Sequence, residues 1–348
     1  MALELPLLRI GLAGFSLEQQ DMLRQLLDQD TATRQVWDFT RPEDADALCV
    51  NGARTQLLPD GMLRVAAGVT GGRSTLIDPK ELHRPIAFAR PLPHPFPPYL
   101  SFDLEPHSVA LVLRELEVML RPLIAQFCLA SQILEQEQAL GSGVYHVTRT
   151  DGALVAVVDL RGDVGVLPTA SALDFDGALW VSVPRQPNQM PPQFLRCSLS
   201  RLMWEYAMRT DRDVLPPRYR TETLYFRRPP RLPHRLLADA HLLILRELSS
   251  EPGNFKDLQQ RTGLTPEVLA QDLAALYLVG AITSNTKRAA PLHSQPNDAM
   301  DGVPSTQAAF DSSRRDEGPP TRTGPQTLQP IGPRRADRTA PAPLQLDH

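Results

Sequence analysis

Apolar residues near the start of the chain form one short continuous run and then recur at helical spacing. The run at 8–13 predicts a buried strand. Ser16 follows as a helix N-cap with Gln19 three residues on, which is the spacing of a capping box. The next apolar side chains recur on one helix face: Met22, Leu23, Leu26 and Leu27. This pattern predicts a strand, a turn and a helix.

Similar apolar runs continue and predict four more strands, at 34–39, 46–51, 74–78 and 85–92. An amphipathic helix is predicted over 108–120. The prolines of 90–100 disfavour both helix and central strand, so we expect a rigid extended connector there. Strands that alternate with helices indicate an α/β domain over 1–122, with a mainly parallel sheet and helices on its faces.

The middle of the chain has a different pattern. Residues 144–168 predict a three-stranded meander whose first turn is Asp151-Gly152, a dipeptide typical of hairpins. A further strand is predicted at 178–183 and a helix at 198–209. We expect an α+β domain over 123–213, and we assign it to no family.

The last periodic segment predicts three helices. The first carries His241 among its apolar positions, the second covers 255–263, and the third covers 265–280. Thr265 is expected as N-cap, Pro266 at the first helical position, and Gly280 as C-cap. With a strand at 281–283 and a basic wing at 287–288, residues 235–288 resemble a winged helix-turn-helix.

Two segments lack this periodicity. Residues 214–234 are rich in arginine and proline, which predicts a linker. Residues 289–348 combine many prolines with almost no apolar pattern and are expected to form a disordered tail. The chain is thus predicted to be a multidomain protein with α/β and α+β parts.

Composition narrows the class of protein. The net charge of −4 argues against a general nucleic-acid coat or a membrane-surface protein. Three widely spaced cysteines and no CxxC pair argue against a disulfide framework or a cysteine-rich zinc site. No secretory signal and no run of about 20 apolar residues is found, so we expect a cytoplasmic, bacterial protein without a membrane partner.

The glycines after the first strand raise the question of a phosphate site. A P-loop needs GxxxxGK[ST], and Gly14 is followed directly by Phe15 and Ser16, without a lysine. A dinucleotide fingerprint needs GxGxxG, but the second and third glycine positions hold Ala13 and Ser16. Neither motif is satisfied, so we expect no cofactor.

The N-terminal segment resembles a response-regulator receiver domain that has lost its active site. That family carries an acidic pair after its first strand, a phosphoacceptor aspartate ending the third, and a lysine before proline ending the fifth. Here the corresponding positions hold Ala13-Gly14, Asn51 and Arg90. The resemblance therefore implies a scaffold that neither binds magnesium nor accepts a phosphoryl group. An unrelated small α/β domain is the alternative.

Other candidate sites are weak or mixed. His241 and His234 lie seven residues apart, about 10 Å along a helix, so they do not form a metal pair, and His241 is expected to be a buried structural residue. The predicted third helix is acidic and has one exposed amide, Gln271. Cationic residues around it could contact nucleic acid or an acidic partner: Arg218, Arg220, Arg227, Arg228, Arg231, Lys256, Arg261, Lys287 and Arg288.

These observations favour a non-catalytic regulatory or signalling protein that acts through an unidentified protein partner. The receiver resemblance suggests a homodimer formed through the N-terminal domain. The alternative is a transcription regulator that uses the winged helix on DNA. An enzyme in the unassigned middle domain is the third hypothesis.

Overall fold

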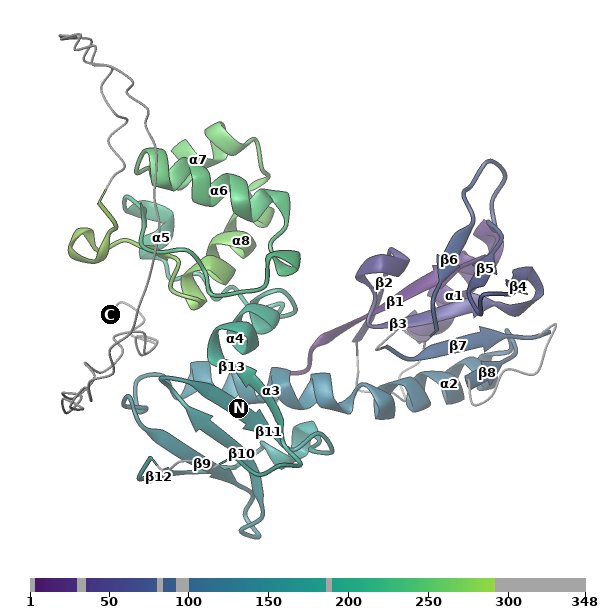
Figure 1. Cartoon of the computed structure of the whole chain (residues 1–348), viewed down its shortest axis with the longest axis horizontal. Coiled ribbons are helices and arrows are strands. Elements are labelled where there is room, and N and C mark those ends of the chain that lie inside the picture. Colours follow the sequence, from purple (N-terminus) through teal and green to yellow (C-terminus); the bar gives the residue numbers. More distant parts are fainter. Residues whose placement is uncertain (1–3, 30–35, 80–83, 92–99, 186–189, 292–348) are drawn as a thin grey trace, which may run out of the picture.

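The computed structural model describes residues 4–29, 36–79, 84–91, 100–185 and 190–291. The N-terminal part is a five-stranded, wholly parallel sheet in the order β2-β1-β3-β7-β8 (Figure 1). Its strands are β1 (Leu7–Ala13), β2 (Val36–Thr40), β3 (Ala47–Asn51), β7 (Ile86–Ala89) and β8 (Leu100–Phe102). The predicted α/β class with a parallel sheet is confirmed.

The two faces of this sheet are covered by different structures. Helices α1 (Leu17–Gln29) and α2 (Pro106–Met119) pack on one face, where Ile10 and Cys49 are buried. The other face carries Leu48 and Phe88. A small antiparallel sheet covers it, formed by β4 (Thr55–Leu57), β5 (Leu63–Val65) and β6 (Thr75–Ile77). The expectation of helices on both faces was therefore wrong, and the strand predicted at 74–78 belongs to this second sheet.

Residues 92–99 of the expected connector lie outside the described residues, and the end of the segment differs from its prediction. Leu100–Phe102 pairs in parallel with β7 and forms the edge strand β8, so the end of the expected connector is part of the sheet. The peptide bond Arg90-Pro91 is cis. A strand at the edge tolerates neighbouring prolines because one side of its backbone needs no partner.

The middle part is a five-stranded antiparallel sheet in the order β12-β9-β10-β11-β13. The meander is confirmed as β9 (Val144–Thr148), β10 (Leu154–Asp159) and β11 (Asp163–Val166), joined by β12 (Leu179–Val183) and β13 (Leu195–Ser198). Helices α3 (Arg121–Glu135) and α4 (Leu199–Ala207) contact each other and this sheet. Figure 1 shows α3 continuing the line of α2 from one sheet to the other.

The last described part contains three helices and a two-stranded sheet, which we call the three-helix unit. Its helices are α6 (Asp239–Ser250), α7 (Phe255–Thr262) and α8 (Pro266–Leu278). The hydroxyl of Thr265 accepts a hydrogen bond from the backbone N–H of Val268, and Gly263 ends α7 in a left-handed conformation. The predicted helices and the N-cap Thr265 are confirmed, whereas the C-cap of α8 is Val279 and Gly280, expected as the cap, follows it with a φ of 67°.

The segment expected as a linker is packed against this unit. It contains α5 (Arg218–Thr221) and β14 (Tyr225–Phe226), and Tyr219 and Leu224 within it are fully buried. β14 pairs antiparallel with β15 (Ile282–Thr283), while Thr286–Arg288 forms a short 3₁₀ turn. The strand after α8 therefore pairs with the expected linker, and the predicted basic wing is not a hairpin. The predicted disordered tail covers 289–348, of which 292–348 lies outside the described residues.

Candidate functional site

The carboxyl ends of the parallel strands form the first candidate site. In doubly wound sheets a ligand binds where the strand order reverses, which is between β1 and β3 here. Asn51 ends β3 at this point and is 7% exposed. Its side-chain N–H donates to Gly14 O at 3.1 Å and to Gln19 Oε1 at 3.3 Å, and its Oδ1 accepts from the N–H of Ala53 at 3.2 Å. Asn51 thus fastens the turn after β1 to the end of β3.

A backbone contact closes the crevice beside Asn51. A Cβ built on Gly68 would lie 1.8 Å from the carbonyl oxygen of Phe15, so the two backbones touch. Phe15 itself is 1% exposed, and a Cβ on Gly14 would lie 2.8 Å from Val65. The segment after β5 therefore packs directly against the turn that follows β1.

Arg90 lies near Asn51, but its guanidinium group does not point into the crevice. β7 pairs with β3 so that Ala89 is opposite Asn51. The guanidinium of Arg90 donates to Ser101 Oγ at 3.1 Å and lies 3.9 Å from the carboxylate of Asp103. The expectation that Arg90 ends the fifth strand was wrong, because β7 is the fourth strand of this sheet in chain order and β8 is the fifth.

The second candidate site is the predicted recognition helix, α8. Its apolar residues are buried from Leu273 to Leu278, and α8 packs against α4 of the middle part. Gln271 is exposed as expected, whereas Asp272 is buried. A helix that reads DNA must present its side chains to the major groove. Most of α8 is instead part of the protein core.

The cationic candidates divide into paired and exposed residues. Arg220 binds Asp213 at 2.8 Å and lies over the Phe255 ring, and Arg261 lies 3.5 Å from the Glu251 carboxylate. Arg218 stacks over the ring of Tyr219. Gln271, Arg231, Lys256 and Lys287 are exposed, while Arg227 and Arg288 are half-buried. Part of the predicted cationic set is therefore engaged in contacts within the protein.

Arg228 has a structural role at the end of α8. Its Nε donates to the carbonyl of Gly280 at 3.2 Å and its Nη2 approaches the carbonyl of Val279 at 3.5 Å. These carbonyls follow the last turn of α8, where a cation also interacts favourably with the helix dipole. Burial, with Arg227 and Arg231 nearby, lowers the pKa of the Arg228 guanidinium.

A buried polar cluster joins α6, α8 and α4. His241 is 3% exposed and Asp272 is 4% exposed. His241 Nε2 lies 3.0 Å from Asp272 Oδ1, and its Nδ1 accepts a hydrogen bond from the N–H of Ala238 at 2.9 Å. The ring of Trp204 contacts the imidazole edge to face at 4.6 Å. The prediction that His241 is a buried residue is confirmed, and its carboxylate partner was missed.

Two ion-pair groups between the N-terminal and middle parts were also missed. Arg209 binds Asp46 through two hydrogen bonds of 2.7 Å, and Asp46 also accepts from the N–H of Arg9 at 2.9 Å. Glu4 accepts hydrogen bonds from Ser131 and Tyr206, both at 2.9 Å. These contacts tie the start of the chain to α3 and α4.

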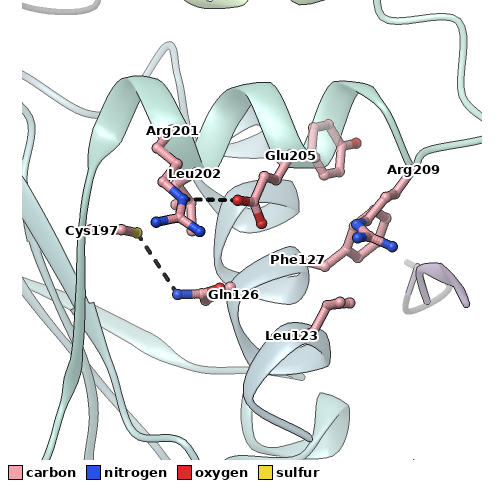
Figure 2. A pocket seen from close by; sticks show the side chains of 9 residues that line it. Leu123, Gln126, Phe127, Cys197, Arg201, Leu202, Glu205 and Arg209 are labelled. Atoms are coloured by element: carbon pink, nitrogen blue, oxygen red, sulfur yellow. Dashed lines mark hydrogen bonds and ion pairs between the residues drawn. The ribbon is translucent and has the colours of Figure 1, made fainter. Parts of the chain in front are cut away.

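A shallow groove between α3 and α4 is the third candidate site (Figure 2). Apolar side chains form its floor, and the Arg201–Glu205 ion pair, at 2.9 Å, lies along its rim. Gln126 points to Cys197 at 3.9 Å. Burial raises the pKa of Cys197 to about 12, so this thiol is not a ready nucleophile. The groove shows no arrangement of nucleophile and base.

The described parts of the chain contain no cluster of three or more metal-ligating side chains. Among the described helices, none has the length and apolar character needed to cross a membrane. Comparison with known proteins gives no match: no family model fits the chain, and neither a curated protein nor a solved structure is significantly similar to it.

Proposed function

We propose that this chain is a non-catalytic regulatory protein of the cytoplasm that acts by binding other proteins. The backbone contact between Gly68 and Phe15 is the observation that carries the proposal, because it fills the crevice where a doubly wound domain would bind its ligand. The strand order β2-β1-β3-β7-β8 is compatible with the resemblance to a receiver domain. Asn51 in place of a carboxylate fits a scaffold that is not phosphorylated.

The edge of the middle sheet offers a surface for a protein partner. β12 is the last strand on its side of the sheet, so one side of its backbone has no partner strand within the described residues. Leu179 is 57% exposed and Val181 49% exposed, and 178–183 contains no charge or proline that would block pairing. A partner that presents an extended strand fits this edge.

Photo-crosslinking in the source cells tests the proposal. A photoreactive phenylalanine analogue at Leu179 should give a discrete adduct with another protein, because this side chain lies on the open edge. The same analogue at Asp60, an exposed turn residue, is the matched control and should give none. The purified full chain, incubated with acetyl phosphate and magnesium, should gain no phosphoryl mass. A phosphorylated chain, or the absence of any adduct at Leu179, would contradict the proposal.

DNA binding is the second candidate, supported by the three-helix arrangement with its capped α8 and by exposed cations near it. The burial of α8 against α4 and the net charge of −4 weigh against it. Fluorescence anisotropy of the full chain with labelled random duplex should therefore show no binding even at low salt. Binding that weakens steeply with salt, and that is lost in R227A/R231A but kept in R24A, would establish DNA as the partner.

A further inference from the structure

Helix α2 exposes apolar side chains on the face opposite its buried one. Val109, Val112, Leu113 and Leu116 are buried against the sheet. On the other side Leu111 is 47% exposed and Val118 is 48% exposed. These two residues lie two turns apart on the same helix face. A single exposed apolar residue needs no explanation, but Leu111 and Val118 mark the two ends of one strip along the helix, with two exposed charged positions between them.

The charges between these residues make the strip self-complementary. Arg114 and Glu115 lie between Leu111 and Val118 and are both exposed. Within the described ranges, neither forms an ion pair. If a second α2 lies antiparallel, with the two-fold axis between Arg114 and Glu115, Leu111 faces Val118 of the partner subunit. Arg114 then faces Glu115 of the partner subunit, and symmetry forms each contact twice.

We propose that α2 is a self-association surface, and that two copies of this chain pair through antiparallel α2 helices. This inference rests on the proposed function, to which it adds a surface and a partner. The reciprocal charges favour a second copy, because an unrelated helix would have to match both the apolar strip and the inverted Arg–Glu order. Met119, 51% exposed, adds to the strip at its end, opposite Ala110 of the partner subunit.

The pairing should be reversible and weak. A helix of 14 residues is about 21 Å long, and one such helix pair buries less than the roughly 1,000 Å² typical of stable interfaces. We therefore expect dimerisation in the range of tens of micromolar. Antiparallel pairing of the helices also places the middle parts of the two subunits at opposite ends of the helix pair, because α3 follows α2 directly.

Sedimentation velocity of the full chain, from low to several hundred micromolar, tests the pairing. The wild-type chain should shift from monomer to dimer. R114E and E115R should each remain monomeric, since each places like charges opposite one another. An equimolar mixture of R114E and E115R should form a heterodimer about as tight as the wild-type dimer, because both cross-axis pairs are again opposite in charge. The double variant R114E/E115R should recover the wild-type shift.

Two further variants separate this surface from any other. L111E should abolish the dimer, whereas L242E should not, because Leu242 is equally exposed, at 46%, but lies on α6. A wild-type chain that stays monomeric, or a dimer that persists in L111E, would overturn the inference. A monomer that still crosslinks another protein at Leu179 would leave the proposed function intact, so the two failures are distinguishable.

Discussion

Replacing His241 by leucine should lower the free energy of unfolding by about 4 kcal/mol, because the buried carboxylate of Asp272 loses the imidazole that lies beside it. Asp272 is 4% exposed and lies 3.0 Å from His241 Nε2. Without the imidazole, the described structure offers its carboxylate no other hydrogen-bond donor. A buried charge without a partner is strongly destabilising.

The double variant H241L/D272L separates the effect of the unpaired carboxylate on stability from the effect of changed side-chain packing. Because leucine pairs fill similar volumes without charge, most of the lost stability should return. L242A, at the exposed neighbouring position, is the control and should change stability by less than about 0.5 kcal/mol. Urea titration followed by tryptophan fluorescence gives all four values. A double variant that is no more stable than H241L would show that the pair does not act as a unit.

Gly68→Ala should be nearly as damaging, with a loss of about 3 kcal/mol, the upper part of the range for overpacked interiors. The new Cβ would lie 1.8 Å from the carbonyl oxygen of Phe15. Because the obstacle is backbone, it cannot rotate away as a side chain would. The β4–β6 sheet would have to shift relative to β1, and Asn51 would lose its hydrogen bond to the carbonyl of Gly14.

Thermal and urea unfolding of G68A measure this loss. Gly141→Ala is the matched control, since a Cβ there makes only an ordinary contact of 3.7 Å with the Tyr145 hydroxyl oxygen. It should leave the melting temperature almost unchanged. If G68A is as stable as G141A, the crevice is not closed by this contact, and the main support for a non-catalytic domain fails.

Local patterns predicted many of the elements correctly. The capping box is present: the N–H of Ser16 donates to Gln19 Oε1 at 3.1 Å, and the N–H of Gln19 donates to Ser16 Oγ at 3.3 Å. The meander and the start of α8 were likewise set by nearby residues. Such features depend on interactions a few positions apart, which a single sequence displays directly.

The features that were missed depend on distant partners. A three-residue run such as Thr75–Ile77 forms a strand, but nothing in it tells which sheet it joins. The spacing of α8 correctly indicated a helix and its apolar positions, yet not that α4 would cover them. Asp46 and Arg209 are 163 residues apart in sequence, so their pairing has no local signal.

The closed crevice could not be predicted for the same reason, because it depends on segments that are distant in sequence. Asn51 and Arg90 were recognised as unusual at strand ends, and that part of the prediction came from residue type and order. The closure of the crevice by Gly68 could not be anticipated, because a glycine in a loop gives no indication of which backbone approaches it. Close approach of this kind is visible only once both segments are placed in space.

The N-terminal sheet is joined to the rest of the molecule at two separate places. One is the α2–α3 joint at Leu120, and the other is the Asp46–Arg209 pair together with Glu4. A domain attached at one point can rotate in any direction, whereas a domain attached at two points can rotate only about the line that joins them. Because α4 contacts both Glu4 and α8, the N-terminal part and the three-helix unit are connected through one short helix.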